Sequence, residues 1–294
     1  MIALVIYNEY SRKGKKLNID YICDRLKEKY NYVNPYKMTN KEDNIIFLKN
    51  NIEKYDLIVI AGGDGTIDEV INVIAKLKII PTIAIIPAGT CNDMANNLNM
   101  PKSVKKTMDV ILMNNTAKYN LYKVNDKYFV YGLACGLISD ASYKAQYKNK
   151  KYLGKLAYYF KALSNISTSK YLNLKIKVNE KMIEGVYSIM LCINSNYLAG
   201  FRLRLLTNDK LKLILIKKTN RLREIITLGM LLLFGEKYKR NIMYIDSSNI
   251  IVESDELIDI NTDGEHIGAF NKININVIPK FLTIINKKGW FRPY

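Results

Sequence analysis

Residues 62–66, Gly-Gly-Asp-Gly-Thr, form the pattern in this chain whose residue types and spacing are best suited to chemistry. They follow a short apolar run typical of a buried strand and precede a run with helical periodicity. Glycines allow a tight turn that brings backbone N–H groups close to a phosphate, and the N-terminus of a following helix favours negative charge. We expect the Asp64 carboxylate there to meet a metal ion or a substrate hydroxyl. The alternative is a simple strand-to-helix turn in which Asp64 or Thr66 caps the helix.

Two further patterns carry candidate polar groups. Residues 87–93 read Pro-Ala-Gly-Thr-Cys-Asn-Asp, for which a helix capped by Asn92 or Asp93 is the alternative interpretation. Residues 263–265, Asp-Gly-Glu, are by themselves typical of a hairpin turn. The chain contains neither the GxxxxGK[ST] phosphate loop nor the GxGxxG dinucleotide fingerprint.

Histidine and cysteine usage excludes several classes of site. The single histidine, His266, argues against Ser-His triads and multi-histidine metal centres, so acid–base chemistry would have to use a carboxylate. The 4 cysteines lie far apart without a CxxC pair. We therefore expect buried thiols in a reducing compartment, with no disulfide framework and no zinc site.

The elements that must position the first two turns alternate between strands and helices. The patterns predict strands at residues 2–7, 32–36, 57–60 and 82–86, and helices at residues 19–30, 43–55, 67–78 and 103–114. Such alternation favours a parallel sheet with helices on both faces, where ligands bind beyond the carboxyl ends of the strands. Because both glycine turns follow predicted strands, we expect them to share one site.

Beyond residue 119 the pattern becomes β-rich, with a predicted hairpin turn at Asn179-Glu180. We expect helices at 153–166 and 222–234, and a mostly antiparallel second domain. The predicted domains are residues 1–122, residues 123–280, and a tail, 281–294, that could pack back on the first domain. The strands predicted in this part are residues 118–124, 127–134, 171–178, 182–193, 211–216, 249–253 and 272–278.

The net charge of +18 indicates an anionic partner, although an AT-rich genome would also enrich lysine without any function. Residues 141–170 combine seven lysines and five tyrosines with no acidic residue. They are the best candidate for a membrane-facing surface, with a solvated helix face over core tyrosines as the alternative. The apolar stretch at 225–234 is too short to span a bilayer. We expect a cytoplasmic protein with peripheral membrane association.

The chain resembles the diacylglycerol kinase catalytic family, in its soluble bacterial branch. The resemblance is carried by the order of the patterns at 62–66, 87–93 and 263–265, together with Glu69 and Asn72. The resemblance extends over almost the whole chain. It implies an N-terminal α/β nucleotide domain of the phosphofructokinase type, a C-terminal β-sandwich, and a site in the cleft between them.

The resemblance also implies a reaction and its participants. It implies ATP and Mg²⁺, and transfer of the γ-phosphoryl group to a lipid hydroxyl, with diacylglycerol giving phosphatidic acid as the leading case. Asp64 and Glu265 match the catalytic positions, Asp64 beside the transferred phosphate and Glu265 as general base, while Asp209 is the one candidate metal ligand. The nucleotide-binding candidates are Asn8, Ser11, Arg12, Thr39, Gly62, Gly63, Asp64, Gly65, Thr66, Thr90 and Asp93.

The chain departs from the family pattern in four places. Glu9 and Arg12 replace a proline and a glycine in the first phosphate turn, and Asn120 replaces an aspartate of a metal–water network. Residues 203–211 lack the Pro-x-Ala and Asp-Asp-Gly pattern that builds a structural magnesium site, and Tyr131-Gly132 replaces an asparagine-containing stretch. These departures predict a divergent lipid kinase with altered metal use or substrate.

Three other functions stay open on the sequence. An NAD kinase has a similar glycine turn, although residues 87–93 and 263–265 favour the lipid branch. A catalytically weakened, membrane-associated regulator of the same fold would fit the altered segment at 203–211. Nucleic-acid binding is supported by charge alone, and we expect no nucleic-acid partner. The sequence does not fix the oligomeric state, so a homodimer stays open.

Overall fold

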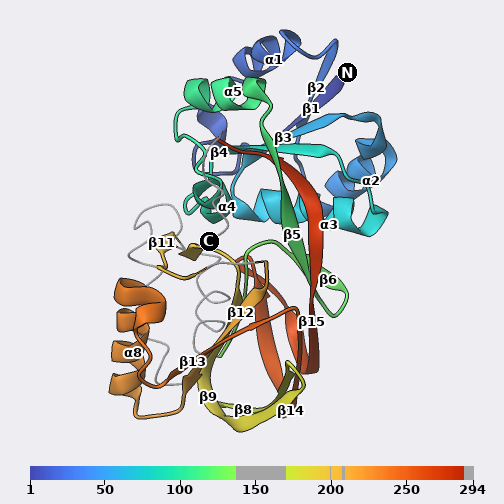
Figure 1. Ribbon diagram of the computed structural model, residues 1–294. Helices are drawn as coiled ribbons and strands as arrows, with labels where there is room; N and C mark the ends of the chain where they lie inside the picture. The colour runs from blue at the N-terminus through green and yellow to red at the C-terminus, as the bar shows by residue number, and fades with distance from the viewer. Residues whose placement is uncertain (137–169, 199, 207–208, 288–294) are drawn as a thin grey trace. The chain divides into compact units, whose positions relative to one another are not determined.

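The computed structural model describes residues 1–136, 170–198, 200–206 and 209–287 (Figure 1). The chain forms two compact units. The first comprises Met1–Leu121 with Pro279–Tyr294, and the second comprises Tyr122–Ile278. Two long strands contribute residues to both units, and the other strands belong to one unit or the other.

The first unit is built on parallel strands. β1 (Ile2–Tyr7) lies between β2 (Tyr32–Lys37) and β3 (Leu57–Gly62), and β3 pairs in parallel with β4 (Thr82–Pro87). The middle of β1 and all of β3 are buried, which fits their continuous apolar sequences. β2 is an edge strand with mostly exposed residues, and it accommodates Pro35 because an edge strand can lack an N–H donor.

Helices connect these strands, and polar caps fix several of their starts. α1 (Ile19–Lys27) begins after Asn18, whose side chain accepts from the amide of Tyr21, and α2 (Lys41–Asn51) begins after Asn40 in the same way. α1 packs with α5 (Val104–Met113), and α2 packs with α3 (Asp64–Leu77) (Figure 1). Two 3-10 turns, η1 (Gly14–Lys16) and η2 (Ile52–Lys54), complete these connections.

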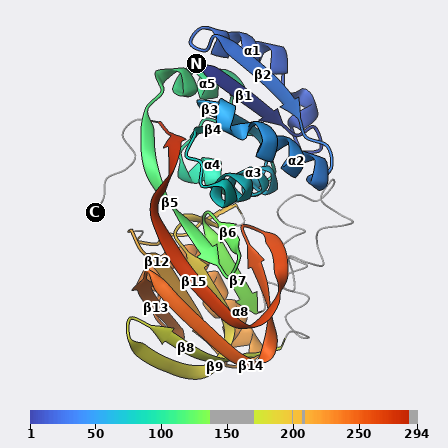
Figure 2. The ribbon, with the colours of Figure 1, turned by 90° about the vertical axis from the view of Figure 1, so that its right-hand side faces the viewer.

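A strand from the end of the chain joins this first unit. β15 (Glu265–Ile285) pairs in parallel with β4 through Thr283 and Ile284, and it runs beside β5 (Thr116–Val124), as Figure 2 shows. Leu282 and Ile284 are buried there. Residues close to both ends of the sequence thus share one core.

The second unit is antiparallel and β-rich. β7 (Gly132–Gly136) pairs with β9 (Lys181–Ile193) and β14 (Asn249–Thr262), and β8 (Leu172–Val178) also pairs with both. These four strands therefore form a closed ring of pairings, and β14 pairs further with β15. The antiparallel β-rich architecture is confirmed, while a two-sheet sandwich stays a prediction. β6 (Lys127–Phe129) forms a hairpin with β5, and β10 (Tyr197–Leu198) forms one with β11 (Phe201–Arg202).

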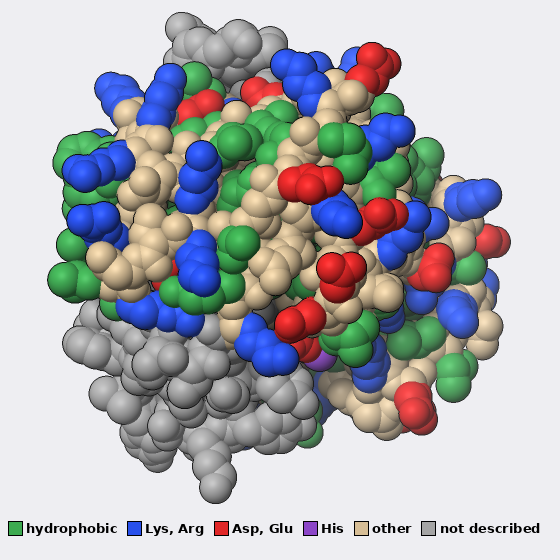
Figure 3. All heavy atoms as spheres, turned by 90° about the horizontal axis from the view of Figure 1, so that it is seen from below, with side chains coloured by type: hydrophobic (Ala, Val, Ile, Leu, Met, Phe, Trp, Pro, Cys, Tyr) green, Lys and Arg blue, Asp and Glu red, His purple; other side chains and the backbone are tan. Residues whose placement is uncertain are grey.

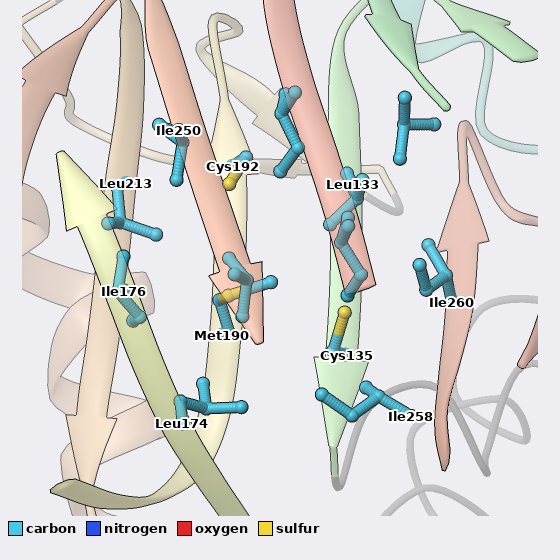
Figure 4. Close-up of a cluster of buried hydrophobic side chains, with 14 of the residues drawn as sticks. Leu133, Cys135, Leu174, Ile176, Met190, Cys192, Leu213, Ile250, Ile258 and Ile260 are labelled. Atoms are coloured by element: carbon cyan, nitrogen blue, oxygen red, sulfur yellow. The ribbon is translucent and has the colours of Figure 1, made fainter. Parts of the chain in front are cut away.

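The core of this unit lies inside the ring (Figure 4). β8 alternates strictly between buried and exposed residues, so Leu174 and Ile176 point inward while Lys175 faces solvent. Met190 and Cys192 of β9 point into the same core.

Residues 189–193 of β9 are apolar on both faces because a helix covers the second face. β9 continues to β12 (Leu211–Lys217) and β13 (Ile242–Ser247), and α8 (Arg221–Phe234), followed by η3 (Gly235–Lys237), packs on this side. Leu191 and Ile214 of the sheet share this second core with Leu231 of the helix. No helix in the described residues is long and apolar enough to cross a membrane.

Several predicted elements differ from the observed ones. The strand predicted at 127–134 is broken at Val130-Tyr131, whose amides are bonded to Asp263 instead of a neighbouring strand. α3 begins at Asp64 rather than residue 67, and α4 (Asp93–Asn97) is the helix proposed only as an alternative. The predicted hairpin at Asn179-Glu180 is confirmed. The helix predicted at 153–166 lies outside the described residues, as does the surface at 141–170 except for Lys170.

Candidate nucleotide and phosphoryl-transfer site

The glycine turn after β3 leads directly into the first turn of α3. Gly63 is the N-cap residue, and no side chain caps this helix. The amide of Thr66 donates to the Gly63 carbonyl at 3.0 Å, so an anion at this turn would have to meet the earliest N–H groups of the helix. Gly62 permits the strand and the helix to pack closely, because a Cβ at that position would lie 2.6 Å from the Cβ of Thr66.

The second turn, after β4, lies against the first. A Cβ on Gly89 would be 2.5 Å from the Cα of Gly63, and the amide of Ala88 donates to the carbonyl of Gly62 at 2.9 Å. Asn92 holds the second turn in shape, because its Oδ1 accepts from the Gly89 amide at 2.7 Å while its Nδ2 donates to the Gly89 carbonyl at 3.0 Å. The structure brings the two glycine turns together, at the carboxyl ends of neighbouring parallel strands.

The Asp64 carboxylate lies where these turns meet. Its Oδ1 accepts from the amide of Met94, in the first turn of α4, at 3.3 Å. Burial raises the pKa of Asp64, although backbone hydrogen bonds from Met94, Asn92 and Asp93 partly offset this. A bound cation would favour the ionised form. The partly buried carboxylate is thus suited to holding a metal ion or a proton.

The loop after β1 forms the third wall. Asn8 donates through Nδ2 to Thr66 Oγ1 at 3.1 Å, and its carbonyl accepts from Ser11 Oγ at 2.7 Å. The amide of Lys13 donates to the carbonyl of Ala88 at 2.9 Å, which links this loop to the second glycine turn. Asn8, Ser11 and Thr66 are therefore neighbours, as the nucleotide-binding prediction requires.

The remaining nucleotide candidates differ in exposure. Thr90 is partly buried, Asp93 is buried, and Gly65 and Arg12 are exposed. Thr39 is exposed at the end of β2, and its amide donates to Asn44 Oδ1 at 3.0 Å.

Glu69, identified from the sequence only as part of the family pattern, is a partly buried carboxyl near Asn44. Glu69 of α3 has a buried Oε1 without a hydrogen-bond partner among the described residues. Burial raises the pKa of Glu69, and a hydrogen bond from Asn44 partly offsets that effect. The spacing of Glu69 from the glycine turn was the only signal that could have pointed to it.

Residues 263–265 form a tight hairpin turn, which the Asp263 side chain ties to residues 130–132. Asp263 and Gly264 both have positive φ, 49° and 89°, between the paired residues Thr262 and Glu265. The buried Asp263 carboxylate accepts from the amide of Val130 at 2.6 Å and from the amides of Tyr131 and Gly132 at 3.0 Å each. Glu265, by contrast, is exposed.

The aspartate therefore anchors the turn and sets where Glu265 begins its strand. Sequence reasoning missed Asp263 because its amide partners are about 130 residues away in the chain. Glu265 belongs to the second unit and Asp64 to the first, and each unit is described by itself.

The chain is similar in sequence to several known proteins. Residues 2–124 match the model of the diacylglycerol kinase catalytic domain. A diacylglycerol kinase of Staphylococcus epidermidis is 32% identical over 299 residues, covering 98% of this chain and 93% of the relative. One from Bacillus subtilis is 31% identical over 244 residues, covering 81% of this chain and 80% of the relative.

This chain belongs to the diacylglycerol kinase family. A solved structure described as a putative diacylglycerol kinase of Bacillus anthracis has a TM-score of 0.82 at 25% identity, covering 98% of this chain and 97% of that one. The structural similarity therefore extends over both units of this chain.

Glu9, the first departure from the family pattern, forms an ion pair. Its carboxylate pairs with Lys37 Nζ of β2 at 2.6 Å. Glu9, which stands where the family pattern has a proline, thus links its loop to the edge strand β2.

The family's structural metal segment is the clearest departure. Asp209 is exposed, and Asn120 Oδ1 accepts from the amide of Lys280 at 2.9 Å. Within the described parts of the chain, no group of three or more His, Cys, Asp or Glu residues could hold a metal ion. Instead, the buried ammonium of Lys212 pairs with Glu236 at 3.0 Å and Asp246 at 2.8 Å. Lys212 therefore bridges two carboxylates directly after segment 203–211, in which this chain departs from the family pattern.

Proposed function

We propose that this protein transfers the γ-phosphoryl group of ATP to the free hydroxyl of diacylglycerol, giving phosphatidic acid. Membership of the family and the similarity to curated diacylglycerol kinases over almost the whole chain support this proposal. The single observation that carries it is the close contact of Gly63 with Gly89 beside the partly buried carboxylate of Asp64. A Cβ on either glycine would fill the space at the meeting point of the two turns.

The proposed nucleotide site uses the three loops of the first unit. The uncapped first turn of α3 offers N–H groups to a phosphate, and the polar side chains around it offer hydrogen bonds. Mg²⁺ in phosphoryl-transfer sites is held by one or two carboxylates together with the substrate phosphates, and Asp64 fits that role. When bound, the ion would neutralise charge on the transferred group. The proposed nucleotide-binding residues are Asn8, Ser11, Arg12, Thr39, Gly62, Gly63, Asp64, Gly65, Thr66, Thr90 and Asp93.

Glu265 is proposed as the general base. Its exposed carboxylate would accept the proton of the lipid hydroxyl while the hydroxyl oxygen bonds to the γ-phosphorus and ADP leaves. Asp263 would position it by fixing the hairpin tip against the amides of residues 130–132. Catalysis of this kind depends on positioning and charge, and the anchored turn supplies positioning.

The finer architecture and setting are also proposals. We assign residues 1–122 to a nucleotide domain of the phosphofructokinase type, residues 123–280 to a β-sandwich lipid-kinase domain, and residues 281–294 to a returning tail. The protein would work in the cytoplasm at an anionic membrane surface, where its acceptor lipid resides, without a nucleic-acid partner. A homodimer is compatible with this setting.

The test is transfer of labelled γ-phosphate from ATP to lipids in anionic mixed micelles, with and without Mg²⁺. Diacylglycerol, phosphatidylglycerol and a sphingoid base are offered separately, and ATP binding is measured alongside. Asp64→Ala and Glu265→Ala should each abolish labelled phosphatidic acid. Glu184→Ala, which removes an exposed carboxylate from β9, should leave the rate unchanged. ATP binding without any lipid product would contradict the proposal and favour a regulator of the same fold.

A further inference from the structure

α8 carries apolar side chains on its outer face as well as on its inner face. Leu231 is buried, with Leu228 and Leu232 partly buried beside it, in the core shared with β9 and β12. The opposite side is exposed. The α8 stripe consists of Leu222, Ile226, Leu233 and Phe234, with 68%, 52%, 63% and 47% of each residue accessible.

The spacing of Leu222, Ile226 and Leu233 places these three residues on one side of the helix, and Phe234 follows Leu233 as the last residue of α8. Ile226 and Leu233 lie four and eleven positions after Leu222, and these spacings return to the same face of an α-helix. Gly229 lies on this face, and a Cβ built there meets no atom within 4 Å. A contiguous exposed apolar patch on a soluble unit marks an interaction surface.

The charges around the α8 stripe are almost all positive. Residues 217–240 contain only two carboxylates, Glu224 and Glu236. Glu224 is buried and pairs with Arg221 at 3.3 Å, while Glu236 pairs with Lys212. The basic rim consists of the exposed cations Lys217, Lys218, Arg223, Lys237, Lys239 and Arg240.

Figure 3 shows the same character on the molecular surface. Lys and Arg side chains stand among hydrophobic ones along the upper part of its left-hand edge, on the side where α8 lies in Figure 1. Five of the rim residues lie in the segments that lead into and out of α8, and Arg223 lies in the first turn of the helix itself.

We propose that the α8 stripe and its basic rim dock on an anionic lipid bilayer, with the helix lying along the headgroup layer. Apolar side chains on one face, bracketed by lysine and arginine, are the pattern of interfacial helices. α8 has 14 residues, a length of about 21 Å, which suits lying on a bilayer rather than crossing it. A second copy of this chain would bring two basic rims together, and that repulsion disfavours it as the occupant.

The choice of a bilayer as partner rests on the proposed function, because the proposed acceptor is a membrane lipid. Docking is therefore tested without ATP, so that binding and catalysis can fail separately. The full chain is sedimented with vesicles of phosphatidylcholine mixed with phosphatidylglycerol, and with vesicles of phosphatidylcholine alone, at low and high salt.

Ile226→Ser combined with Leu233→Ser should weaken binding to the anionic vesicles by about tenfold or more. Lys239→Gln combined with Arg240→Gln should weaken it and reduce its salt dependence. The matched controls are Leu257→Ser, an equally exposed leucine of β14, and Lys105→Gln, an exposed lysine of α5. Both controls should bind like the wild type, and all variants should unfold at or above the wild-type temperature.

A direct readout of insertion complements the binding assay. Leu233→Trp, in a chain with Trp290→Phe, should show a blue-shifted emission on vesicles and quenching by brominated acyl chains. Two outcomes would overturn the proposal. One is wild-type protein that does not bind anionic vesicles. The other is an Ile226→Ser, Leu233→Ser variant that binds the vesicles as tightly as wild type. If that variant instead converts a dimer into a monomer and keeps its vesicle binding, the stripe is a contact between two copies of the chain.

Discussion

The backbone of Gly89 lies against the backbone of Gly63, so that a Cβ on Gly89 would be 2.5 Å from the Cα of Gly63. Two turns that are 26 residues apart in the chain thereby form one surface beside Asp64. The contact is between backbones, and no rotamer change can relieve a side chain added there. Stability and nucleotide binding should therefore both depend on it.

Gly89→Ala should separate the two turns, because the added methyl group must push backbone atoms apart. We expect a loss of about 1–3 kcal/mol in the free energy of unfolding and a clear drop in ATP affinity. Urea denaturation and titration calorimetry measure the two effects.

Gly229→Ala is the matched control for this substitution. It adds the same methyl group where no atom lies within 4 Å, in the interior of α8. It should stabilise the protein by about 0.5–1 kcal/mol, since alanine is the better helix former. Equal losses in the two variants would show that the contact at Gly89 is unimportant.

Asp263→Asn should damage both stability and activity, because the amide group cannot accept from three backbone N–H groups as a carboxylate does. We expect the free energy of unfolding to fall by about 2–3 kcal/mol, with a lower kcat. Glu265→Gln should instead abolish turnover without a change in the unfolding midpoint, since Glu265 is exposed. A stable and fully active Asp263→Asn variant would remove the anchoring role.

Asp64→Asn should stabilise the metal-free protein at neutral pH while abolishing phosphoryl transfer. Burial raises the folded-state pKa of Asp64 above its usual value of 3.8, so the folded state binds the proton more tightly than the unfolded state. The stability of the wild type should thus decline as pH rises from about 3.8 through that raised pKa. In Asp64→Asn this part of the pH dependence should be missing. Thermal unfolding of both proteins across that range, in EDTA, gives the comparison, and identical curves would contradict the assignment.

Lys212→Met should cost about 3–5 kcal/mol of stability, because it leaves two carboxylates near a buried site without their cation. Burial acts to lower the pKa of Lys212, but its hydrogen bonds to Asp246 and Glu236 outweigh burial and raise the pKa. Adding Glu236→Gln and Asp246→Asn should restore most of the loss. Lys272→Met, which breaks an exposed pair with Glu253 at 2.7 Å, should change stability little. A similar small effect at Lys212 would mean that the buried cation is dispensable.

The sequence predicted strands and helices well where the pattern of apolar residues was unambiguous. β1 was predicted at residues 2–7 and observed there, because a continuous apolar run of that length has few alternatives to a buried strand. The break at Val130 in the strand predicted for 127–134 was missed, since it depends on a carboxylate from residue 263. The start of α3 at Asp64 was also missed, because glycines weaken the helical pattern in its first turn.

The sequence by itself determined the ingredients of this protein: the glycine turns, the single histidine, the carboxylates that remain for acid–base chemistry, and the α/β-then-β order of elements. These follow from local composition and short-range periodicity. Only the tertiary structure decided that Gly63 meets Gly89, that Asp263 is an anchor and Glu265 its exposed neighbour, and that α8 keeps an apolar face uncovered. The physical reason is that contacts between distant segments depend on strand order and packing, which local residue patterns do not encode.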